Sequence, residues 1–437
     1  MKRSISLTRR HMLAGGAAAL TLLSAPARAQ AERKVVFWHS YTQKSRSDFM
    51  RGIADRFEAA NPGVKVEIEV MSWGAFSQRW PAARAANALP DVAITLGRNA
   101  IPMSMAGALN TTSEVLKTLG GSAAFIPGLI EKSCKFKDQY VSLPHYVHAV
   151  LNIYRKDRLA AAGLGVPVSW DDTLRAAIAM TKPPEYFGNI LKLAKDDYAG
   201  AELLWVLTRS AGGHFYDAEG KVTFDSEPVR EATEFLAEIG RKTSGPGVAN
   251  MRLSDTFSLV NSGKQSMVND SAAIIGVAVQ DAPEVAKNLD ATYMPRKKDG
   301  GYQTNLISTV LPKGKNPEDA QRFLAFLYGE QNYMPFMTTI PLFMFPAYLK
   351  ADMKKFTDHP VVGAYPNVVK ATLDSVERGT MAGMDFGLNP YAAPVLTSGL
   401  VEDMLQRIIL TNASVKEEVT ATAQKMDRLL QSIRSRT

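Results

Sequence analysis

Short apolar runs alternate with amphipathic segments over the first hundred residues. Residues 34–38 form a short apolar run, which is typical of a buried strand. Apolar residues at four-residue spacing within 49–57 predict one face of a helix. Residues 64–70 alternate apolar and polar, which predicts a half-buried strand, and 91–94 predict another. This β-α-β-α-β order favours a parallel, doubly wound sheet.

The mixed pattern continues to the end of the chain. Ser169, followed three residues later by Asp172, predicts a capped helix that runs to Met180. A strand is predicted over 151–154, and further helices are predicted over 229–242, 316–327 and 415–433. Neither an internal repeat nor a low-complexity linker interrupts the sequence. Two lobes joined by several chain crossings are therefore expected.

Composition places the chain among globular proteins. Of its 437 residues 46% are hydrophobic and 22% are charged, which excludes disordered and fibrous classes. A single cysteine, Cys134, excludes a disulfide framework and cysteine-rich metal sites. The net charge of +8 falls to +3 without residues 1–29, because 46 basic residues then face 43 acidic ones. Nucleic acid is therefore not an expected partner.

Residues 1–29 have the pattern of a signal peptide. A basic segment precedes the weakly apolar run 12–25, and cleavage is expected before Gln30. Arg9 and Arg10 resemble a twin-arginine signal, although Met12 stands where that pattern usually has Phe; a Sec signal is the alternative. No cysteine stands directly after the cleavage point, and no later apolar run reaches 18 residues. A soluble periplasmic protein without a lipid anchor is expected.

Catalytic and cofactor motifs are missing. The sequence has no H-E-x-x-H, G-x-S-x-G, C-x-x-C or G-x-G-x-x-G, and residues 262–265 do not complete a P-loop. His145 and His148 stand three residues apart, so on a strand they would face opposite sides and would not pair on a metal. We therefore expect no enzymatic activity, no cofactor and no metal.

Seven segments occur in a fixed order along the chain: VVFWHS at 35–40, FEAANPG at 57–63, LPDV at 89–92, LNIYRK at 151–156, SWDD at 169–172, SGKQSM at 262–267 and KGKNPEDA at 313–320. In their order and spacing they resemble family 1 of the extracellular solute-binding proteins of ABC importers, which includes maltose-type and glycerol-phosphate-type binders. The resemblance covers nearly all of the chain after residue 29. It implies the type II periplasmic-binding fold, an α/β architecture with two hinged lobes and a ligand cleft between them. Lobe I is expected at 30–144 and 304–340, and lobe II at 145–303 and 341–437.

Candidate ligand contacts follow the carboxyl ends of the predicted strands or lie near the expected crossings, where α/β proteins bind ligands. Sugars need aromatic faces and polar side chains. The candidates are His39, Tyr41, Trp73, Arg98, Asn99, His148, Trp205, Asp270, Asn305 and Phe343.

The expected function is a receptor that delivers a carbohydrate or sugar derivative to an ABC permease, as a monomer. Where maltose-type binders usually place an aromatic platform this chain has Ser271 to Ala273, which disfavours a long maltodextrin. Arg98 suits an acidic or phosphorylated sugar. The alternatives are a receptor for a non-sugar solute such as a polyamine, an opine or an organic phosphate, and, more remotely, a periplasmic hydrolase.

Overall fold

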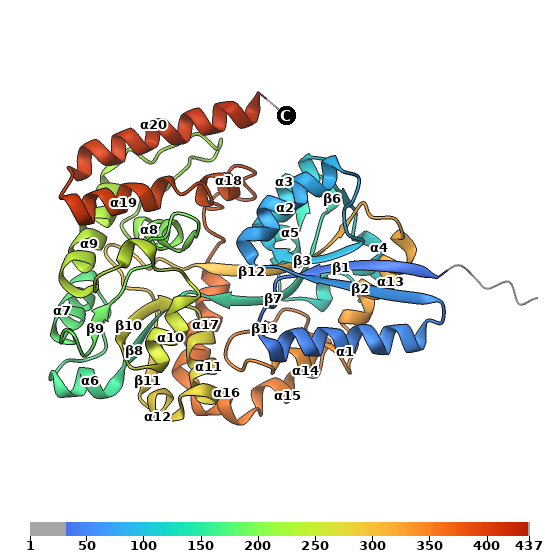
Figure 1. Ribbon diagram of the computed structural model, residues 1–437, viewed down its shortest axis with the longest axis horizontal. Helices are drawn as coiled ribbons and strands as arrows, with labels where there is room; N and C mark the ends of the chain where they lie inside the picture. Colours follow the sequence, from blue (N-terminus) through green and yellow to red (C-terminus); the bar gives the residue numbers. More distant parts are fainter. Residues whose placement is uncertain (1–31, 436–437) are drawn as a thin grey trace, which may run out of the picture.

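The computed structural model describes residues 32–435. Two main sheets lie side by side and divide the molecule into a large-sheet half and a small-sheet half (Figure 1). The larger sheet has the strand order β13-β7-β12-β3-β1-β2, and β4 pairs with β12. Its strands are β1 (Arg33–His39), β2 (Val64–Val70), β3 (Val92–Leu96), β4 (Leu109–Asn110), β7 (Leu143–Ala149), β12 (Thr304–Pro312) and β13 (Phe345–Pro346).

The β-α-β-α-β order predicted for the first hundred residues is confirmed. Strand β1 pairs in parallel with both β2 and β3, and helices α1 (Lys44–Ala60) and α2 (Trp73–Ala85) connect the three strands. Gly63 turns the chain from α1 into β2 with a φ of 83°, which an L side chain rarely adopts. Strand β12 is antiparallel to its neighbours β3 and β7. The sheet is therefore mixed, since this strand comes back from the other half.

The smaller sheet has the order β11-β8-β10-β9. Its strands are β8 (Leu151–Arg155), β9 (Phe187–Asn189), β10 (Gln265–Asp270) and β11 (Leu289–Thr292). Strand β10 is antiparallel to β8 and parallel to β9. The segment 262–265, which partly matched a P-loop, is a turn into β10 with Gly263 at a φ of 70°. A separate hairpin joins β5 (Lys135–Phe136) to β6 (Gln139–Tyr140).

Helices cover both sheets. After α1 and α2, the early part of the chain forms α3 (Ala100–Met105), α4 (Ser113–Thr118) and α5 (Leu129–Ser133). Two helices follow β12, namely α13 (Pro317–Leu327) and α14 (Tyr333–Met337). The middle of the chain forms α6 (Lys156–Ala161), α7 (Trp170–Ala179), α8 (Ala199–Ser210), α9 (Glu227–Thr243), α10 (Asp255–Asn261), α11 (Ala273–Asp281) and α12 (Pro283–Ala286). The last part forms α15 (Met353–Thr357), α16 (Pro360–Ala364), α17 (Pro366–Arg378), α18 (Ala392–Leu396), α19 (Leu400–Thr411) and α20 (Val415–Arg434).

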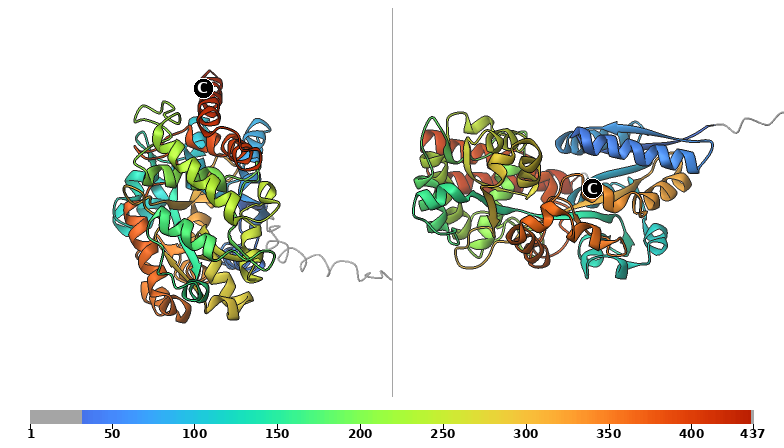
Figure 2. Two further views of the ribbon diagram at one scale, coloured as in Figure 1. Left: turned by 90° about the vertical axis from the view of Figure 1, so that its left-hand side faces the viewer. Right: turned by 90° about the horizontal axis from the view of Figure 1, so that it is seen from below.

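The chain passes between the two sheets more than once. Val150 alone separates β7 of the larger sheet from β8 of the smaller one, and 293–303 connect β11 to β12. The division expected after residue 144 falls inside β7, whereas the division before 304 coincides with the start of β12. Both Figure 1 and the right-hand view of Figure 2 show the halves side by side. The lobe boundaries stay a prediction.

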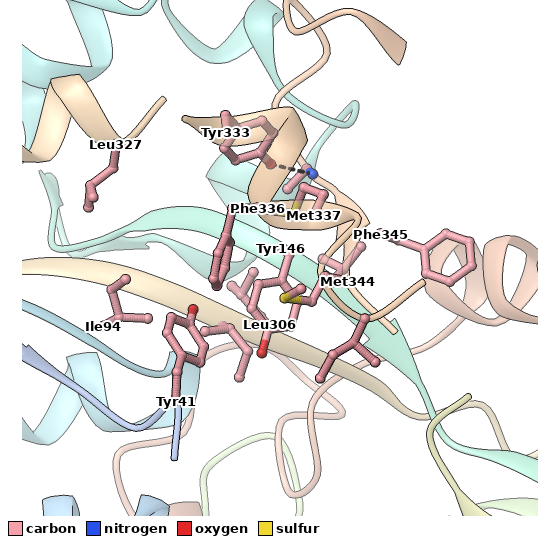
Figure 3. Close-up of a cluster of buried hydrophobic side chains, with 14 of the residues drawn as sticks. Tyr41, Ile94, Tyr146, Leu306, Leu327, Tyr333, Phe336, Met337, Met344 and Phe345 are labelled. Atoms are coloured by element: carbon pink, nitrogen blue, oxygen red, sulfur yellow. Dashed lines mark hydrogen bonds between the residues drawn. The ribbon is translucent and has the colours of Figure 1, made fainter. Parts of the chain in front are cut away.

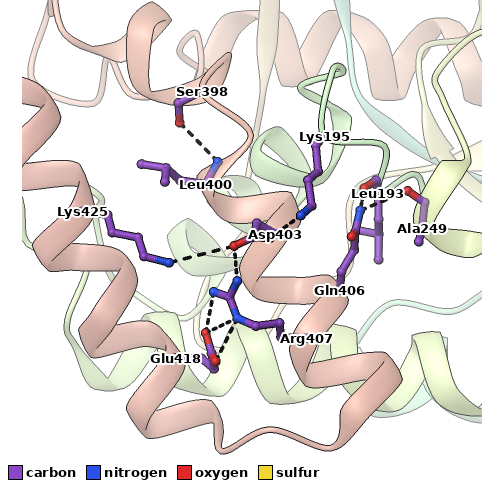
Figure 4. Close-up of polar contacts among 10 residues, drawn as sticks. All are labelled: Leu193, Lys195, Ala249, Ser398, Leu400, Asp403, Gln406, Arg407, Glu418 and Lys425. Atoms are coloured by element: carbon purple, nitrogen blue, oxygen red, sulfur yellow. Dashed lines mark hydrogen bonds and ion pairs between the residues drawn. The ribbon is translucent and has the colours of Figure 1, made fainter.

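Local capping and ion pairs fix the helices of the small-sheet half. The expected capping box of α7 is present, since Ser169 Oγ accepts from Asp172 N and Asp172 Oδ2 accepts from Ser169 N, both at 3.1 Å. Asp403 joins α19 to Lys195 before α8 and to Lys425 on α20 (Figure 4). Within residues 32–435, no helix combines the length and the apolar character that a membrane span needs.

Candidate functional site

A cavity of about 480 Å³ lies between the two halves. From the large-sheet half it is lined by residues that follow β1, β2 and β3, and from the small-sheet half by residues that follow β9 and β10. Strands β7 and β12 contribute His148 and Asn305 where the chain passes from one half to the other. Carboxyl ends of parallel strands meet at one edge of a sheet, and that edge is where α/β proteins bind ligands.

Four helices of nine or more residues begin at this cavity. Gln43 before α1, Trp73 at the start of α2, Ala199 at the start of α8 and Ala273 at the start of α11 all line it. The first N–H groups of a helix have no partner within the helix, and the helix dipole is positive at that end. The four helix ends therefore create a positive potential in the cavity.

Arg98 connects the two halves of the molecule. It follows β3 in the large-sheet half, and its guanidinium forms an ion pair with Glu202 on α8 of the small-sheet half. The ring of Tyr198 lies under the same guanidinium at 4.4 Å. The side chains of Arg98 and Glu202 are only 4% and 10% exposed, so the pair is largely shielded from water. Nε and Nη2 of Arg98 have no hydrogen-bond partner.

A second guanidinium, that of Arg46 on α1, also lines the cavity. It lies over the rings of Tyr41 and Phe343, at 4.9 and 5.4 Å, and donates to the side-chain oxygen of Gln43. Arg46 is 2% exposed, and its Nε and Nη1 have no hydrogen-bond partner.

A lysine–aspartate pair forms the small-sheet wall. Lys192 Nζ lies 2.8 Å from Asp270 Oδ2 and donates to Asn269 O, also at 2.8 Å. Asp270 Oδ1 accepts from Ser271 N at 2.7 Å. Asp270 thus lines the cavity and at the same time anchors the end of β10.

The histidines near the cavity are neutral. Burial lowers the pKa of His148 to about 3, and the positive charges of Arg46 and Arg98 contribute to the same shift. Burial, followed by Arg46, lowers the pKa of His39 to about 4. A neutral imidazole both donates and accepts a hydrogen bond, and Nδ1 of His148 has no partner. His148 is therefore available for a hydroxyl group.

Six of the ten candidate residues line the cavity. They are Trp73, Arg98, His148, Asp270, Asn305 and Phe343. Trp73 packs against Tyr41 in a T-shaped arrangement, with 5.9 Å between ring centroids, and the ring centroid of Phe343 lies 4.9 Å from that of His148. Asn305 accepts from the side chain of Gln303 at 3.2 Å.

The other four candidates do not line it. His39 and Tyr41 are buried side by side, and Tyr41 packs against Tyr146 and Phe336 (Figure 3). Asn99 donates to Thr95 Oγ1 at 2.9 Å. Trp205 is buried in the hydrophobic core of the small-sheet half, and its Nε1 donates to Asp385 at 3.3 Å. Ligand contact by these four stays a prediction.

Sequence reasoning missed several lining residues, notably Arg46, Lys192, Tyr198, Glu202 and Gln303. Only Arg46 carried a usable signal, because it is a basic residue shortly before the helical pattern of 49–57; the structure places it in the first turn of α1, where the helix dipole disfavours a cation. The expected separation of His145 from His148 is observed. The β7–β12 pairing slips by one residue at His145, which packs on Tyr328 instead of the cavity. Residues 32–435 contain no cluster of three or more His, Cys, Asp or Glu side chains that could hold a metal.

Comparisons with known proteins agree with this geometry. The family model of bacterial extracellular solute-binding proteins matches residues 42–334. A putative ABC transporter periplasmic-binding protein of Escherichia coli K12, YcjN, is 22% identical over 409 residues, which are 91% of this chain and 93% of that protein.

Solved structures show the same fold. An ABC transporter solute-binding protein of Thermotoga lettingae bound with α-D-tagatose has a TM-score of 0.79 at 19% identity, and the match covers 91% of this chain and all of that one. A solute-binding protein of Agrobacterium vitis with bound D-mannitol has a TM-score of 0.77 at 17% identity, with 92% and 99% covered. The expected two-lobe α/β fold is therefore confirmed.

Proposed function

The chain belongs to the bacterial extracellular solute-binding proteins, and from this premise we propose that its cavity binds one small carbohydrate or sugar derivative for delivery to an ABC permease. Family membership makes the chain a binding protein and not an enzyme. The observation that carries the proposal is the cavity itself, whose walls come from both sheets. A ligand that contacts both halves stabilises the closed arrangement over an open one.

The size and lining of the cavity support a small polyhydroxylated ligand. Its volume of about 480 Å³ lies within the usual range for small-molecule sites, roughly 300–1,000 Å³. Trp73 and Phe343 offer aromatic faces for C–H surfaces, and His148 and Asn305 offer polar groups for hydroxyls. Two proteins of the same fold hold a ketohexose and a hexitol, α-D-tagatose and D-mannitol. Ser271 to Ala273 stand where maltose-type binders usually place an aromatic platform, so a long oligosaccharide is disfavoured.

A thermal-shift screen of residues 30–437, refolded to remove carried-over ligand, tests the proposal. The panel contains monosaccharides, disaccharides, polyols, uronic acids, sugar phosphates, polyamines and amino acids. A ligand at 100 times its dissociation constant stabilises the native state by about 2.7 kcal/mol, which raises Tm measurably. Stabilisation by a sugar or polyol derivative is expected. Stabilisation by polyamines or amino acids alone would assign the cavity to a non-sugar solute.

We propose a membrane permease as the macromolecular partner, contacted through surfaces of both halves, with the receptor acting as a monomer. Closure around ligand changes the relative position of the halves, so that a permease touching both can recognise the loaded form. The loaded receptor is expected to stimulate ATP hydrolysis by its transporter in proteoliposomes more than the empty one. Sedimentation analysis that gave a stable dimer would contradict the monomer.

Residues 1–29 lie outside the described residues. We propose that they direct export to the periplasm through the twin-arginine route. The support is the Arg9-Arg10 pair before the apolar run 12–25. A reporter fused to residues 1–35 is expected to reach the periplasm and to stay in the cytoplasm when both arginines become lysine. Unchanged export of the lysine variant would indicate the Sec route.

A further inference from the structure

Six of the eight charged side chains in the cavity wall form ion pairs, and Arg46 and Asp197 do not. The wall holds four basic side chains, Arg46, Arg98, Lys192 and Arg252, and four acidic ones, Asp196, Asp197, Glu202 and Asp270. Ion pairs join Arg98 to Glu202, Lys192 to Asp270 and Arg252 to Asp196. Asp197 accepts from the backbone N–H groups of Tyr198 and Leu253, at 2.6 and 2.7 Å. Within residues 32–435, no carboxylate lies within ion-pair distance of Arg46.

This unpaired guanidinium is deeply buried. Arg46 is 2% exposed between the rings of Tyr41 and Phe343, and it donates a hydrogen bond to the neutral side chain of Gln43. Arginine stays charged in proteins, and a buried charge without a counter-charge costs several kcal/mol. The cation therefore calls for an anion that the protein itself does not supply.

The helix that carries Arg46 points to the same conclusion. Arg46 lies in the first turn of the 17-residue helix α1, and that turn contains no acidic residue. Gln43, the N-cap residue of α1, makes no side-chain capping hydrogen bond and lines the cavity. A cation at a helix N-terminus is unfavourable by itself, whereas an anion there is bound by both the dipole and the free N–H groups.

A second group of unsatisfied donors faces the same space. Nε and Nη2 of Arg98 have no partner, although its Nη1 is paired with Glu202. Both guanidiniums lie close enough to His148 to lower its pKa, so the two positive charges act on one region of the cavity. Neutral hydroxyl groups could accept these hydrogen bonds but would leave the charge of Arg46 uncompensated.

Resting on the proposed function, we propose that the ligand is an acidic sugar derivative whose carboxylate or phosphate group is bound by Arg46 at the N-terminus of α1. The polyol part then lies against Trp73 and the His148 side of the cavity. An oxyanion supplies two or three acceptor oxygens to the guanidinium and the helix N–H groups, which is the strongest class of hydrogen bond available there.

Isothermal titration calorimetry on the refolded protein compares acids with their neutral counterparts. The pairs are D-gluconate with D-glucitol, D-galacturonate with D-galactose, and glycerol 3-phosphate with glycerol. At least one acid is expected to bind about 100-fold more tightly than its neutral twin. The first two pairs report on a carboxylate and the third on a phosphate, so the two sources of the anion are distinguished.

Charge variants on α1 assign the effect to Arg46. Arg46→Gln is expected to weaken binding of the preferred acid at least 100-fold, and Arg46→Lys is expected to weaken it less. Lys44→Gln removes the same charge from the exposed side of the same turn, where Lys44 pairs with Asp48, and is expected to change affinity less than threefold. The Tm of ligand-free Arg46→Gln should not fall, because no internal ion pair is lost.

Each result has a defined meaning. Equal or tighter binding of the neutral twins overturns the acidic ligand but leaves the carbohydrate receptor intact. Binding of polyamines or amino acids, with no response to any of the six probes, overturns the proposed function itself. Retained preference for the acid in Arg46→Gln overturns the role of Arg46. A fall in the Tm of ligand-free Arg46→Gln without loss of affinity would show a structural role only.

Discussion

The carboxyl group of Glu402, on α19, is buried behind the cavity wall against the first turn of α8. Glu402 Oε1 accepts from Ala201 N at 2.8 Å, while Oε2 has no partner. Burial raises its pKa to about 8, against the lowering effect of backbone hydrogen bonds, and the charges of Asp197 and Glu202 add to the rise. Glu402 is therefore protonated at neutral pH, and its ionisation places an uncompensated charge beside the helix that carries Glu202.

Protein stability is expected to fall with rising pH because of this group. The folded pKa lies above the ordinary value of 4.5, so the contribution is complete below pH 4.5 and is lost as pH rises through about 8. Each pKa unit corresponds to about 1.4 kcal/mol of unfolding free energy. Urea unfolding at pH 5, 7 and 9 should show this decline in the wild type and a flatter profile in Glu402→Gln. Glu234→Gln, an exposed change on α9, is the control that keeps the decline; equal slopes in all three proteins would contradict the assignment.

Substitutions of two tryptophans test whether ligand contact belongs to the cavity lining or to the core. Trp73 lines the cavity, whereas Trp205 is fully buried in the core of the small-sheet half. Trp73→Leu is expected to weaken ligand binding about 10- to 100-fold with little change in Tm, because an aromatic face is lost from the site. Trp205→Phe is expected to lower Tm and leave affinity within threefold. Calorimetry and thermal unfolding of both variants test this, and the reverse pattern would assign ligand contact to Trp205.

Side chains alternate in direction at the end of β1 and in the segment that follows it, which explains why His39 and Tyr41 do not reach the cavity. After β1, Ser40 and Thr42 line it, while the neighbouring His39 and Tyr41 turn into the core. The sequence could place this loop at the carboxyl end of a strand, but the side facing the ligand depends on packing against Phe336, far along the chain. The same holds for Tyr198 and Glu202, which the sequence did not indicate, since their partner Arg98 lies in the other half.

At the scale of elements, the sequence predicts the regular parts well. Strands and helices with strong periodicity, such as β1, α1, β2 and α9, lie where the patterns indicate. The exception is the parallel sheet. Strand β12 pairs between β3 and β7 in antiparallel orientation, because the chain returns from the small-sheet half before it enters the sheet. A local pattern contains no information on such a long-range insertion.

Helix α11 packs unusually close to the segment that carries Phe343. A Cβ on Gly276 would lie 2.1 Å from the carbonyl oxygen of Pro341, so one of the two backbones would have to move. Gly276→Ala is expected to cost about 1–3 kcal/mol of stability and to weaken ligand binding by shifting Phe343 and Ala273. Chemical unfolding and calorimetry measure the two effects. Gly363→Ala on α16 is the matched control, since no heavy atom lies within 4 Å of its Cβ, and similar losses in both variants would contradict the steric explanation.

For the whole molecule, the two halves are joined by strands and by an ion pair. Strands β7 and β12 continue towards the small-sheet half through Val150 and through 293–303, and these connections are natural places for a hinge. Across the cavity, the pair Arg98–Glu202 is largely buried. Opening would expose both side chains to water, so the pair favours the closed arrangement only while both charges are present.

Removing one partner is therefore expected to open the molecule. In Glu202→Gln the buried Arg98 loses its counter-charge in the closed form, at a cost of up to about 3–5 kcal/mol, whereas water solvates it in the open form. Since each 1.4 kcal/mol shifts a two-state equilibrium tenfold, the ligand-free variant should have a larger radius of gyration by small-angle X-ray scattering and a weaker ligand affinity.

The double variant Arg98→Met/Glu202→Gln should recover the compact form. Asp270→Asn breaks the similarly buried pair with Lys192 inside one half, so it should lower stability without a change in radius. A Glu202→Gln radius equal to that of the wild type would show that this ion pair does not control closure.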